Sequence, residues 1–346
     1  MKIVIDDKIP YIRESIGMLT DDAVYLKGSE IGPEDVRRAD ALIVRTRTRC
    51  DESLLRGSSV KFVATATIGF DHIDAAYLRR AGIEWMSCPG CNAASVAQYV
   101  RSVLLLLKRD RGARLESMTL GLVGCGHVGT KVKAVAEEYG MRVLVCDPPR
   151  QERGEAGTFA TMDDIEHEAD IITFHVPLTR NEAHPTYHMA DGAFFDRLKK
   201  RPLIINTSRG AVVDNGALLD ALIYNKVEDA AVDTWENEPC IDRRLLDRVW
   251  LATPHIAGYS ADGKVNADNM VLDGLCRHFG LRRPPLIVPP ALPPTFVPSA
   301  DDDTLRLQLY NPLEDSARLK ASPESFEELR GNYPLRREQA DIMPAL

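Results

Sequence analysis

A glycine-rich turn between a strand-like run and a helical stretch constrains this chain more than any other feature. Residues 119–123 are mainly apolar, and Gly124, Gly126 and Gly129 follow them in the spacing G-x-G-x-x-G. The first glycine permits a tight turn, the second lets the backbone approach a pyrophosphate, and the third allows the helix to pack closely on the strand. The spacing alone is a weak signal. The strand before it and the helix after it make it predict a dinucleotide-binding turn.

The residues around this turn indicate which dinucleotide it would bind. The predicted helix N-terminus at His127, Val128 and Gly129 offers free N–H groups to the phosphates. Asp147 ends the next strand-like run, about 20 residues beyond the glycines, where an acid would hold the adenosine ribose hydroxyls. A carboxylate there would repel a 2′-phosphate, so we predict NAD rather than NADP as the cofactor. Asp147 could also form the turn before two prolines, and the two roles are compatible.

Short apolar runs alternate with helical stretches on both sides of this turn. Buried parallel strands are apolar runs of this kind. The predicted strands are Lys2–Ile5, Ala41–Arg45, Lys61–Thr65 and Ile83–Met86, then Leu120–Val123, Arg142–Cys146, Ile171–Phe174, Leu203–Ile205, Asp229–Val232 and Trp250–Ala252. A chain of 346 residues is too long for one ordinary core. We therefore predict an α/β fold with two doubly wound Rossmann-like domains.

Other segments suggest how these domains are connected. Residues 92–110 have apolar side chains at helical spacing and are predicted to link the two domains. A second helical stretch runs to about residue 280. The proline-dense segment 284–294 cannot be helix or central strand, so it is predicted to be a stiff linker. The last fifty residues are polar, with a helix expected around 325–330.

Composition excludes several classes of function. The net charge of −8, with no basic tail, argues against nucleic-acid binding. The longest aliphatic run, residues 103–107, is too short to span a bilayer. The N-terminus lacks the apolar core and the cleavage site of a signal peptide, so we expect a cytoplasmic protein with no membrane partner.

The cysteines fit the same compartment. There are seven, an odd number scattered along the chain, which suits reduced thiols rather than a disulfide framework. Cys88 and Cys91 could form a redox dithiol or half a zinc site, or they could be buried thiols flanking a Pro-Gly turn. No second cysteine pair or histidine set completes a metal site, so we favour buried thiols and predict no metal.

Three charged residues in the second half follow predicted strands and point to catalysis. Oxidation of a 2-hydroxy acid requires a base near neutrality, and His255 after the strand at 250–252 provides one. Glu238 would orient the imidazolium, and Arg209 offers a planar fork for a carboxylate. Taken singly, each could be structural: a core histidine, a loop acid or a surface cation. Each of the three follows a predicted strand of the same dinucleotide-binding domain, and this arrangement favours a catalytic role over a structural one.

Several short segments match motifs of a known family. They are 88–92 (Cys-Pro-Gly-Cys-Asn), 145–150 (Val-Cys-Asp-Pro-Pro-Arg), 209–215 (Arg-Gly-Ala-Val-Val-Asp-Asn), 253–259 (Thr-Pro-His-Ile-Ala-Gly-Tyr) and, near the end, 328–333 with 336–338. With these motifs the chain resembles the D-isomer-specific 2-hydroxyacid dehydrogenases over residues 1 to about 280. The C-terminal motif is similar to a dimerisation domain found in the branch of that family that serves vitamin B6 biosynthesis.

The resemblance implies an activity and a domain plan. The activity would be NAD-dependent oxidation of 4-phospho-D-erythronate to 2-oxo-3-hydroxy-4-phosphobutanoate, in pyridoxal 5′-phosphate (vitamin B6) biosynthesis, by a homodimer. The substrate (lid) domain would comprise residues 1–94 and 257–280, and the NAD-binding domain residues 95–256. Residues 281–346 would form a small α+β C-terminal dimerisation domain.

The resemblance also implies roles for individual residues. Arg209 would hold the substrate carboxylate, His255 would accept the proton, and Glu238 would be its partner. Asp233 and Gly258 would lie near the cofactor. Thr46, Thr67 and Tyr259 would contact the substrate. Arginines alternate with threonines around Thr46 and could present cations to a phosphate, or they could form a solvated edge; they are Arg45, Arg47 and Arg49.

The sequence departs from the family pattern at a few positions and leaves other functions open. Thr46 replaces a serine but keeps the hydroxyl, Gln98 replaces a common glutamate, and the C-terminal domain is short. A related dehydrogenase for 3-phosphoglycerate or for another D-2-hydroxy acid is the closest alternative. A non-enzymatic NAD sensor is the alternative of another class, and the intact catalytic set argues against it.

Overall fold

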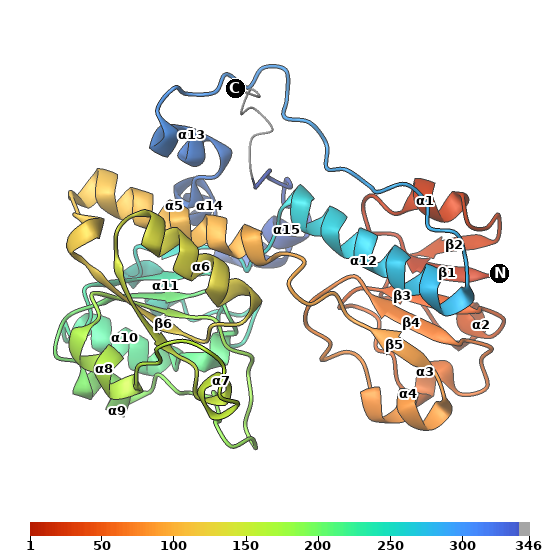
Figure 1. The fold of residues 1–346 in the computed structure, drawn as a ribbon, viewed down its shortest axis with the longest axis horizontal. Helices are drawn as coiled ribbons and strands as arrows, with labels where there is room; N and C mark the ends of the chain where they lie inside the picture. The colour runs from red at the N-terminus through yellow and green to blue at the C-terminus, as the bar shows by residue number, and fades with distance from the viewer. Residues whose placement is uncertain (339–346) are drawn as a thin grey trace. The chain divides into compact units, whose positions relative to one another are not determined.

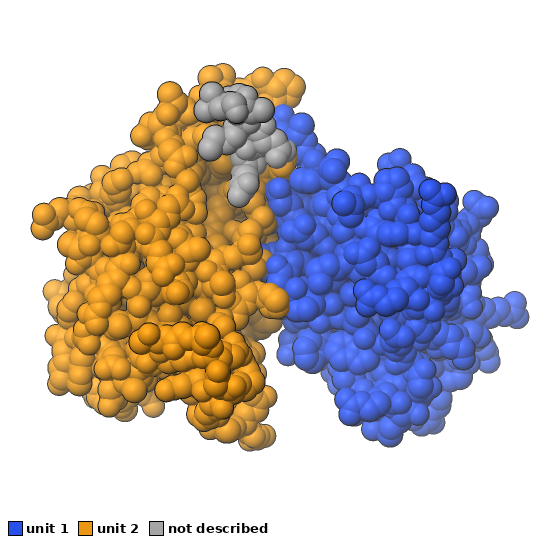
Figure 2. All heavy atoms as spheres, viewed as in Figure 1, with its two compact units in different colours: residues 1–92, 260–292 blue, residues 93–259, 293–346 orange. Residues whose placement is uncertain are grey.

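The structure of this chain, a computed structural model, describes residues 1–338. The chain divides into two compact units (Figure 2). Unit 1 consists of residues 1–92 and 260–292, and unit 2 of residues 93–259 and 293–338. Within the described residues, no helix is long and apolar enough to cross a membrane.

Unit 1 is built on a five-stranded parallel sheet in the order β2-β1-β3-β4-β5 (Figure 1). Its strands are β1 (Ile3–Asp6), β2 (Ala23–Leu26), β3 (Ala41–Val44), β4 (Phe62–Thr65) and β5 (Glu84–Met86). The four strands predicted for this region are confirmed. The strand that the sequence analysis missed, β2, lies at the edge of the sheet and is only half-buried, so it lacks the continuous apolar signature of a central strand.

Helices cover both faces of this sheet. One face packs on α2 (Pro33–Val36), α3 (Glu52–Leu55) and α4 (Ala75–Ala81), and the other on α1 (Arg13–Gly17) and α12 (Ala261–Phe279). The predicted helix after His255 is therefore α12, and it ends at Gly280 in the left-handed conformation that favours glycine. Because Val271, Leu272 and Leu275 of α12 are buried with β1, β3 and β4, this late segment completes the core of the N-terminal unit.

Unit 2 contains a six-stranded parallel sheet in the order β11-β10-β9-β8-β6-β7. Its strands are β6 (Thr119–Val123), β7 (Arg142–Cys146), β8 (Ile171–Phe174), β9 (Leu203–Asn206), β10 (Asp229–Val232) and β11 (Leu251–Ala252). All six were predicted. The chain order reverses between β6 and β8, and ligands of such sheets bind beyond the carboxyl ends of the strands at that switch point.

The helices of unit 2 form one layer on each side of the sheet (Figure 1). The linking helix predicted at 92–110 is α5, and it packs with α6 on one face. The bounds are α5 (Ala93–Arg111), α6 (His127–Glu138), α7 (Pro148–Glu152), α8 (Met162–Glu168), α9 (Gly192–Arg197), α10 (Asn215–Ile223) and α11 (Arg243–Arg248), with 3₁₀ turns η1 (Leu115–Ser117) and η2 (Gly210–Val212). Helices α8 to α11 supply the core of the opposite face.

The described part of the predicted C-terminal domain is divided between the units: residues 281–292 belong to unit 1, and the segment from residue 293 to residue 338 belongs to unit 2. It forms α13 (Asp302–Leu309), α14 (Pro312–Ala321), η3 (Pro323–Ser325) and α15 (Phe326–Gly331). Leu307 and Tyr310 join the core cluster around α5, while Leu319 and Phe326 join the cluster on the other face. The described helices are too short to enclose a core, so they bury their apolar side chains on the sheet unit. Residues 284–294 form no helix or strand, as predicted.

Candidate active site

The turn between β6 and α6 has the geometry that its glycines predict. Gly124 has a φ of 87°, and a Cβ there would lie 2.6 Å from the carbonyl oxygen of His175. A Cβ on Gly129 would collide with the carbonyl oxygen of Gly124. Gly126, the N-cap of α6, has nothing within 4 Å of an added Cβ. Gly124 and Gly129 therefore allow backbone segments to pack closely. Gly126 leaves open space at the N-terminus of α6, where a phosphate would bind.

Asp147 holds this turn in place. One carboxylate oxygen accepts a hydrogen bond from the backbone N–H of Cys125 at 2.8 Å, and the other accepts from the N–H of Arg150 at 3.1 Å. Arg150 reaches the carbonyl of Cys125 and pairs with Glu155 at 2.6 Å. Asp147 thus lies beside the glycine turn, where the sequence placed it, and it also caps α7.

His175 is a residue of this site that the sequence analysis missed. It directly follows β8, and its Nε2 lies 2.9 Å from the hydroxyl of Thr173. Its Nδ1 lies 3.4 Å from the hydroxyl of Thr207, which follows β9. Desolvation lowers the pKa of His175 to about 3, so the ring is neutral near pH 7. No motif marks this histidine; its position directly after the predicted strand 171–174 was the available signal.

Arg209 lies just beyond β9 and is half-buried. The side chain of Asn206 donates to the carbonyl of Arg209 at 3.2 Å, and Arg209 Nη1 donates to the carbonyl of Ser208 at 2.9 Å. Within residues 1–338, Arg209 forms no ion pair. A Cβ on Gly210 would collide with the backbone of Trp235, so the loop of Arg209 lies directly against the loop that leads to Glu238. The guanidinium is thus held by neutral partners and can still pair with an anion.

Glu238 and His255 form the predicted pair. His255 Nδ1 lies 2.8 Å and 3.0 Å from the two carboxylate oxygens of Glu238, and the N–H of Trp235 donates to the same carboxylate at 2.9 Å. Burial alone would raise the pKa of Glu238, but the hydrogen bond and charge of His255, the Trp235 N–H and the charge of Arg330 hold it below its ordinary value. With Nδ1 occupied, Nε2 is the nitrogen that can face a substrate.

Asp233 positions the turn that carries His255. Its buried carboxylate accepts from the hydroxyl of Thr253 at 2.7 Å and from the N–H groups of Ile256 and Ala257 at 2.8 Å and 3.0 Å. Burial raises the pKa of Asp233, and His255 and these hydrogen bonds oppose that shift. His255 has a φ of 57°, in the left-handed region, so its backbone requires this support. The role of Asp233 near the cofactor stays a prediction.

The C-terminal segment grips the same turn from another side. Arg336 is buried and donates to the carbonyls of Ile256, Ala257 and Tyr259 at 3.1, 2.6 and 2.9 Å. Its Nε also donates to Gln98 of α5 at 2.8 Å, so the glutamine at this position pairs with a buried arginine. The sequence analysis assigned this segment to dimerisation only. Its contacts with the His255 turn are non-local, and no local motif could reveal them.

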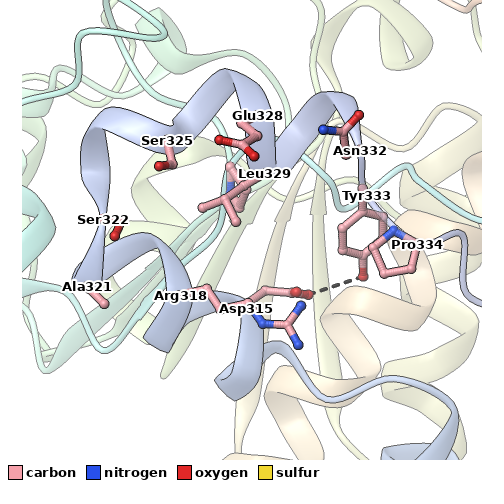
Figure 3. Close-up of a pocket in the computed structure, with 11 residues that line it drawn as sticks. Asp315, Arg318, Ala321, Ser322, Ser325, Glu328, Leu329, Asn332, Tyr333 and Pro334 are labelled. Atoms are coloured by element: carbon pink, nitrogen blue, oxygen red, sulfur yellow. Dashed lines mark hydrogen bonds between the residues drawn. The ribbon is translucent and has the colours of Figure 1, made fainter.

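A cavity of about 410 Å³ is lined mainly by residues of this segment (Figure 3). Pro254, the residue before His255, also lines it. Asp315 and Tyr333 line it and are joined by a hydrogen bond of 3.1 Å. Burial raises the pKa of Asp315, while the Tyr333 hydrogen bond and nearby arginines oppose the shift. The cavity is lined by acidic, basic and apolar side chains, so its lining does not indicate one class of ligand.

The predicted substrate residues of unit 1 lie at the carboxyl ends of adjacent strands. Thr46 is exposed after β3, and Thr67 follows β4 with its hydroxyl 2.7 Å from that of Thr65. Among the neighbouring arginines, Arg45 donates to the carbonyl of Lys8 at 3.0 Å, and Arg49 pairs with Asp51 at 2.8 Å. The strand ends of this unit therefore present hydroxyl groups together with arginines.

The two cysteines that suggested a redox or zinc site are buried. Cys88 Sγ lies 3.4 Å from the carbonyl of Thr65 and 3.5 Å from that of Ala267, and burial raises the pKa of its thiol. Among residues 1–338, no three histidine, cysteine or acidic side chains are grouped so that they could hold a metal ion.

Comparison with known proteins assigns the chain to a family. Residues 94–257 match the model of the D-isomer specific 2-hydroxyacid dehydrogenase NAD binding domain. This chain belongs to the family of D-isomer-specific 2-hydroxyacid dehydrogenases. Among its curated relatives is the erythronate-4-phosphate dehydrogenase of Bacteroides thetaiotaomicron, 53% identical over 339 residues that cover 98% of this chain and 97% of the relative.

Solved structures support the fold and the cofactor. The D-lactate dehydrogenase of Aquifex aeolicus, complexed with NAD and lactic acid, has a TM-score of 0.66 and 25% identity, and the match covers 81% of this chain and 96% of that one. The NAD-bound 3-phosphoglycerate dehydrogenase of Entamoeba histolytica has a TM-score of 0.68 and 26% identity, covering 81% and 95%. The predicted α/β fold, the family and the NAD cofactor are confirmed.

Proposed function

We propose that this protein is an NAD-dependent dehydrogenase that oxidises 4-phospho-D-erythronate to 2-oxo-3-hydroxy-4-phosphobutanoate, a step of pyridoxal 5′-phosphate biosynthesis. The observation that carries the proposal is the Glu238–His255 pair, which lies with Arg209 beyond the strands of a sheet bearing an open glycine turn. The full-length similarity to a named erythronate-4-phosphate dehydrogenase supports the choice of substrate.

The residues of unit 2 fit the cofactor. Gly126 leaves room for a pyrophosphate, the N-terminus of α6 offers N–H groups, and Asp147 supplies a carboxylate for the ribose hydroxyls. When bound, the nicotinamide accepts the hydride from C2 of the substrate. Gly258 and Asp233 are proposed to lie near it.

The remaining chemistry falls to side chains of this chain. Arg209 would hold the substrate carboxylate by two parallel hydrogen bonds. His255 Nε2 would take the proton of the C2 hydroxyl, so that the C2–H bond electrons leave as hydride and the carbonyl forms. Glu238 would stabilise the resulting imidazolium through Nδ1. Thr46, Thr67 and Tyr259 are proposed to contact the rest of the substrate.

Turnover with matched substrates tests the proposal. Purified protein would be assayed with 4-phosphoerythronate and with 3-phosphoglycerate, each with NAD, with and without 2-oxoglutarate as an acceptor. We expect turnover of 4-phosphoerythronate to exceed that of 3-phosphoglycerate, and His255→Gln to lower it by about 10²–10⁴-fold. A preference for 3-phosphoglycerate would retain the catalytic roles and refute the substrate; NAD binding without turnover of any hydroxy acid would favour a sensor.

We further propose a cytoplasmic homodimer to which residues 281–346 contribute contacts. The similarity of residues 328–338 to a dimerisation domain supports this, although part of the segment also packs on unit 2. Residues 339–346 of the proposed domain lie outside the described residues. Light scattering at several concentrations would test it, and a mass of one chain throughout would refute it.

A further inference from the structure

The helix α15 carries an arginine that reaches the catalytic pair. Arg330 Nη1 lies 3.7 Å from a carboxylate oxygen of Glu238, and Arg330 Nε donates to the hydroxyl of Tyr259 at 3.3 Å. The side chains of Arg330 and Glu238 are 24% and 17% exposed, so solvent screens their interaction only in part. The separation exceeds that of a hydrogen bond, so Arg330 acts on Glu238 mainly through its charge.

Glu238 therefore lies between the imidazole of His255 and the guanidinium of Arg330. His255 bonds both carboxylate oxygens on one side, and Arg330 approaches one of them from the C-terminal segment. Further charged groups of unit 2 near this pair include the buried Asp233, the guanidinium of Arg336, which contacts the backbone of residues 256–259, and Glu327, which acts on Arg330. A cation beside a carboxylate reduces the attraction that the carboxylate exerts on an imidazolium.

The chain is anchored both before and after Arg330, which fixes the position of this residue. Phe326, the first residue of α15, is fully buried in the core of unit 2. Six residues beyond Arg330, the buried Arg336 is fixed to the carbonyls of the His255 turn and lies 3.8 Å from the ring centre of Tyr310. The packing of Phe326 and the hydrogen bonds of Arg336 thus help to position Arg330, in addition to its own contacts with Glu238 and Tyr259.

We propose that Arg330 is a positioning residue for the acid–base pair: it shares the charge of Glu238 and fixes the hydroxyl of Tyr259. This sets the pH at which His255 becomes able to accept a proton. Without Arg330, Glu238 would hold the imidazolium more strongly, and His255 would stay protonated to a higher pH. The inference rests on the proposed function in taking His255 as the proton acceptor.

The test compares Arg330→Met and Arg330→Lys with wild type in the full-length protein. The matched control is Arg318→Met, because Arg318 lies in the same segment, is 57% exposed and has Glu314 at 4.0 Å. The pH profile of kcat/KM for NAD-dependent oxidation is measured for each. We expect the acid limb of Arg330→Met to move upward by roughly half a unit to one unit. Arg330→Lys, which keeps the cation, should restore most of that shift, and Arg318→Met should show none.

A second readout separates this inference from the proposed function. NMR titration of the His255 ring in the resting protein, assigned by the signal missing from His255→Gln, requires no turnover. If wild type oxidises no hydroxy acid but Arg330→Met still raises the titration midpoint of His255, the proposed function fails, while the coupling of Arg330 to the Glu238–His255 pair stands. If Arg330→Met keeps the melting temperature of wild type and neither the midpoint nor the acid limb moves, Arg330 is structural only. Arg330→Gln replaces the methionine variant if that variant does not fold.

Discussion

Units 1 and 2 are built alike, with parallel strands and helices on both faces, but they place different groups beyond their strands. In unit 1, β3 and β4 are followed by the hydroxyl residues Thr46 and Thr67. In unit 2, the strands are followed by a glycine turn and by the charged residues Arg209 and His255, with Glu238 beside the histidine. In both units a site can form at the carboxyl ends of the parallel strands. The residues of the loops that follow these strands determine the chemistry of the site.

The largest effect should come from the acid–base group of unit 2. We expect His255→Gln to lower kcat by about 10²–10⁴-fold, since proton transfer by a positioned base contributes that much. NAD affinity should not change, because the glycine turn is untouched. Steady-state kinetics and NAD titration would check this, with His184→Gln, a variant of a surface histidine, as the control. Retention of the wild-type kcat would show that His255 is not the acid–base group, and unit 2 would then not differ from unit 1 in this respect.

Arg209 should have the next largest effect. Arg209→Met would lose a charge-assisted grip on the substrate carboxylate, and we expect kcat/KM to fall by roughly 10²-fold. Arg209→Lys should recover only part of the loss, because an ammonium group cannot form the same two parallel bonds. Equal activity of the lysine and wild-type proteins would show that a point charge is enough at this position.

A pair of glycine variants separates ligand binding from folding within the turn of unit 2. We expect Gly126→Ala to weaken NAD binding about tenfold at an unchanged melting temperature, because the added methyl group enters open space kept for the pyrophosphate. Gly129→Ala should instead lower the melting temperature, since its methyl group meets the carbonyl of Gly124. Calorimetry gives both quantities. The reverse pattern would contradict the assigned roles.

The smallest effect concerns a buried carboxyl group of unit 1 that no proposed chemistry uses. Burial raises the pKa of Asp268 to about 7, against the hydrogen bond from the N–H of Tyr11 and the charges of Lys264 and Arg45. Because this value lies above that of the unfolded chain, about 3.9, the folded state binds more protons between these two pH values. The contribution of Asp268 to stability therefore falls as pH rises toward 7.

Replacement of this group should make unit 1 less sensitive to pH. We expect Asp268→Asn to raise the melting temperature relative to wild type by a few degrees at pH 8, and by less at pH 5. Asp273→Asn, on the same helix but half-exposed, serves as the control. A melting-temperature difference that is equal at the two pH values would mean that Asp268 does not titrate in this range.

The strands, the glycine turn and the pairing of Glu238 with His255 could be predicted because each has a local pattern. The apolar runs gave ten of the strands, and the strand–helix context identified the turn after β6. The half-buried edge strand β2 has a weaker pattern and was missed. His175 was not predicted because one histidine after a strand matches no motif, although its backbone carbonyl lies against Gly124 of the turn.

Periodicity and spacing, which act over a few residues, were enough to predict the two parallel sheets, the glycine turn and the Glu238–His255 pair. Contacts between distant segments, which no local pattern predicts, place α12 in the core of unit 1 and pack the C-terminal helices on unit 2. The tertiary structure alone brought Arg330 and Arg336 to the turn of His255. Such contacts join residues more than seventy positions apart, and they depend on which buried surfaces remain to be covered once the sheets have formed.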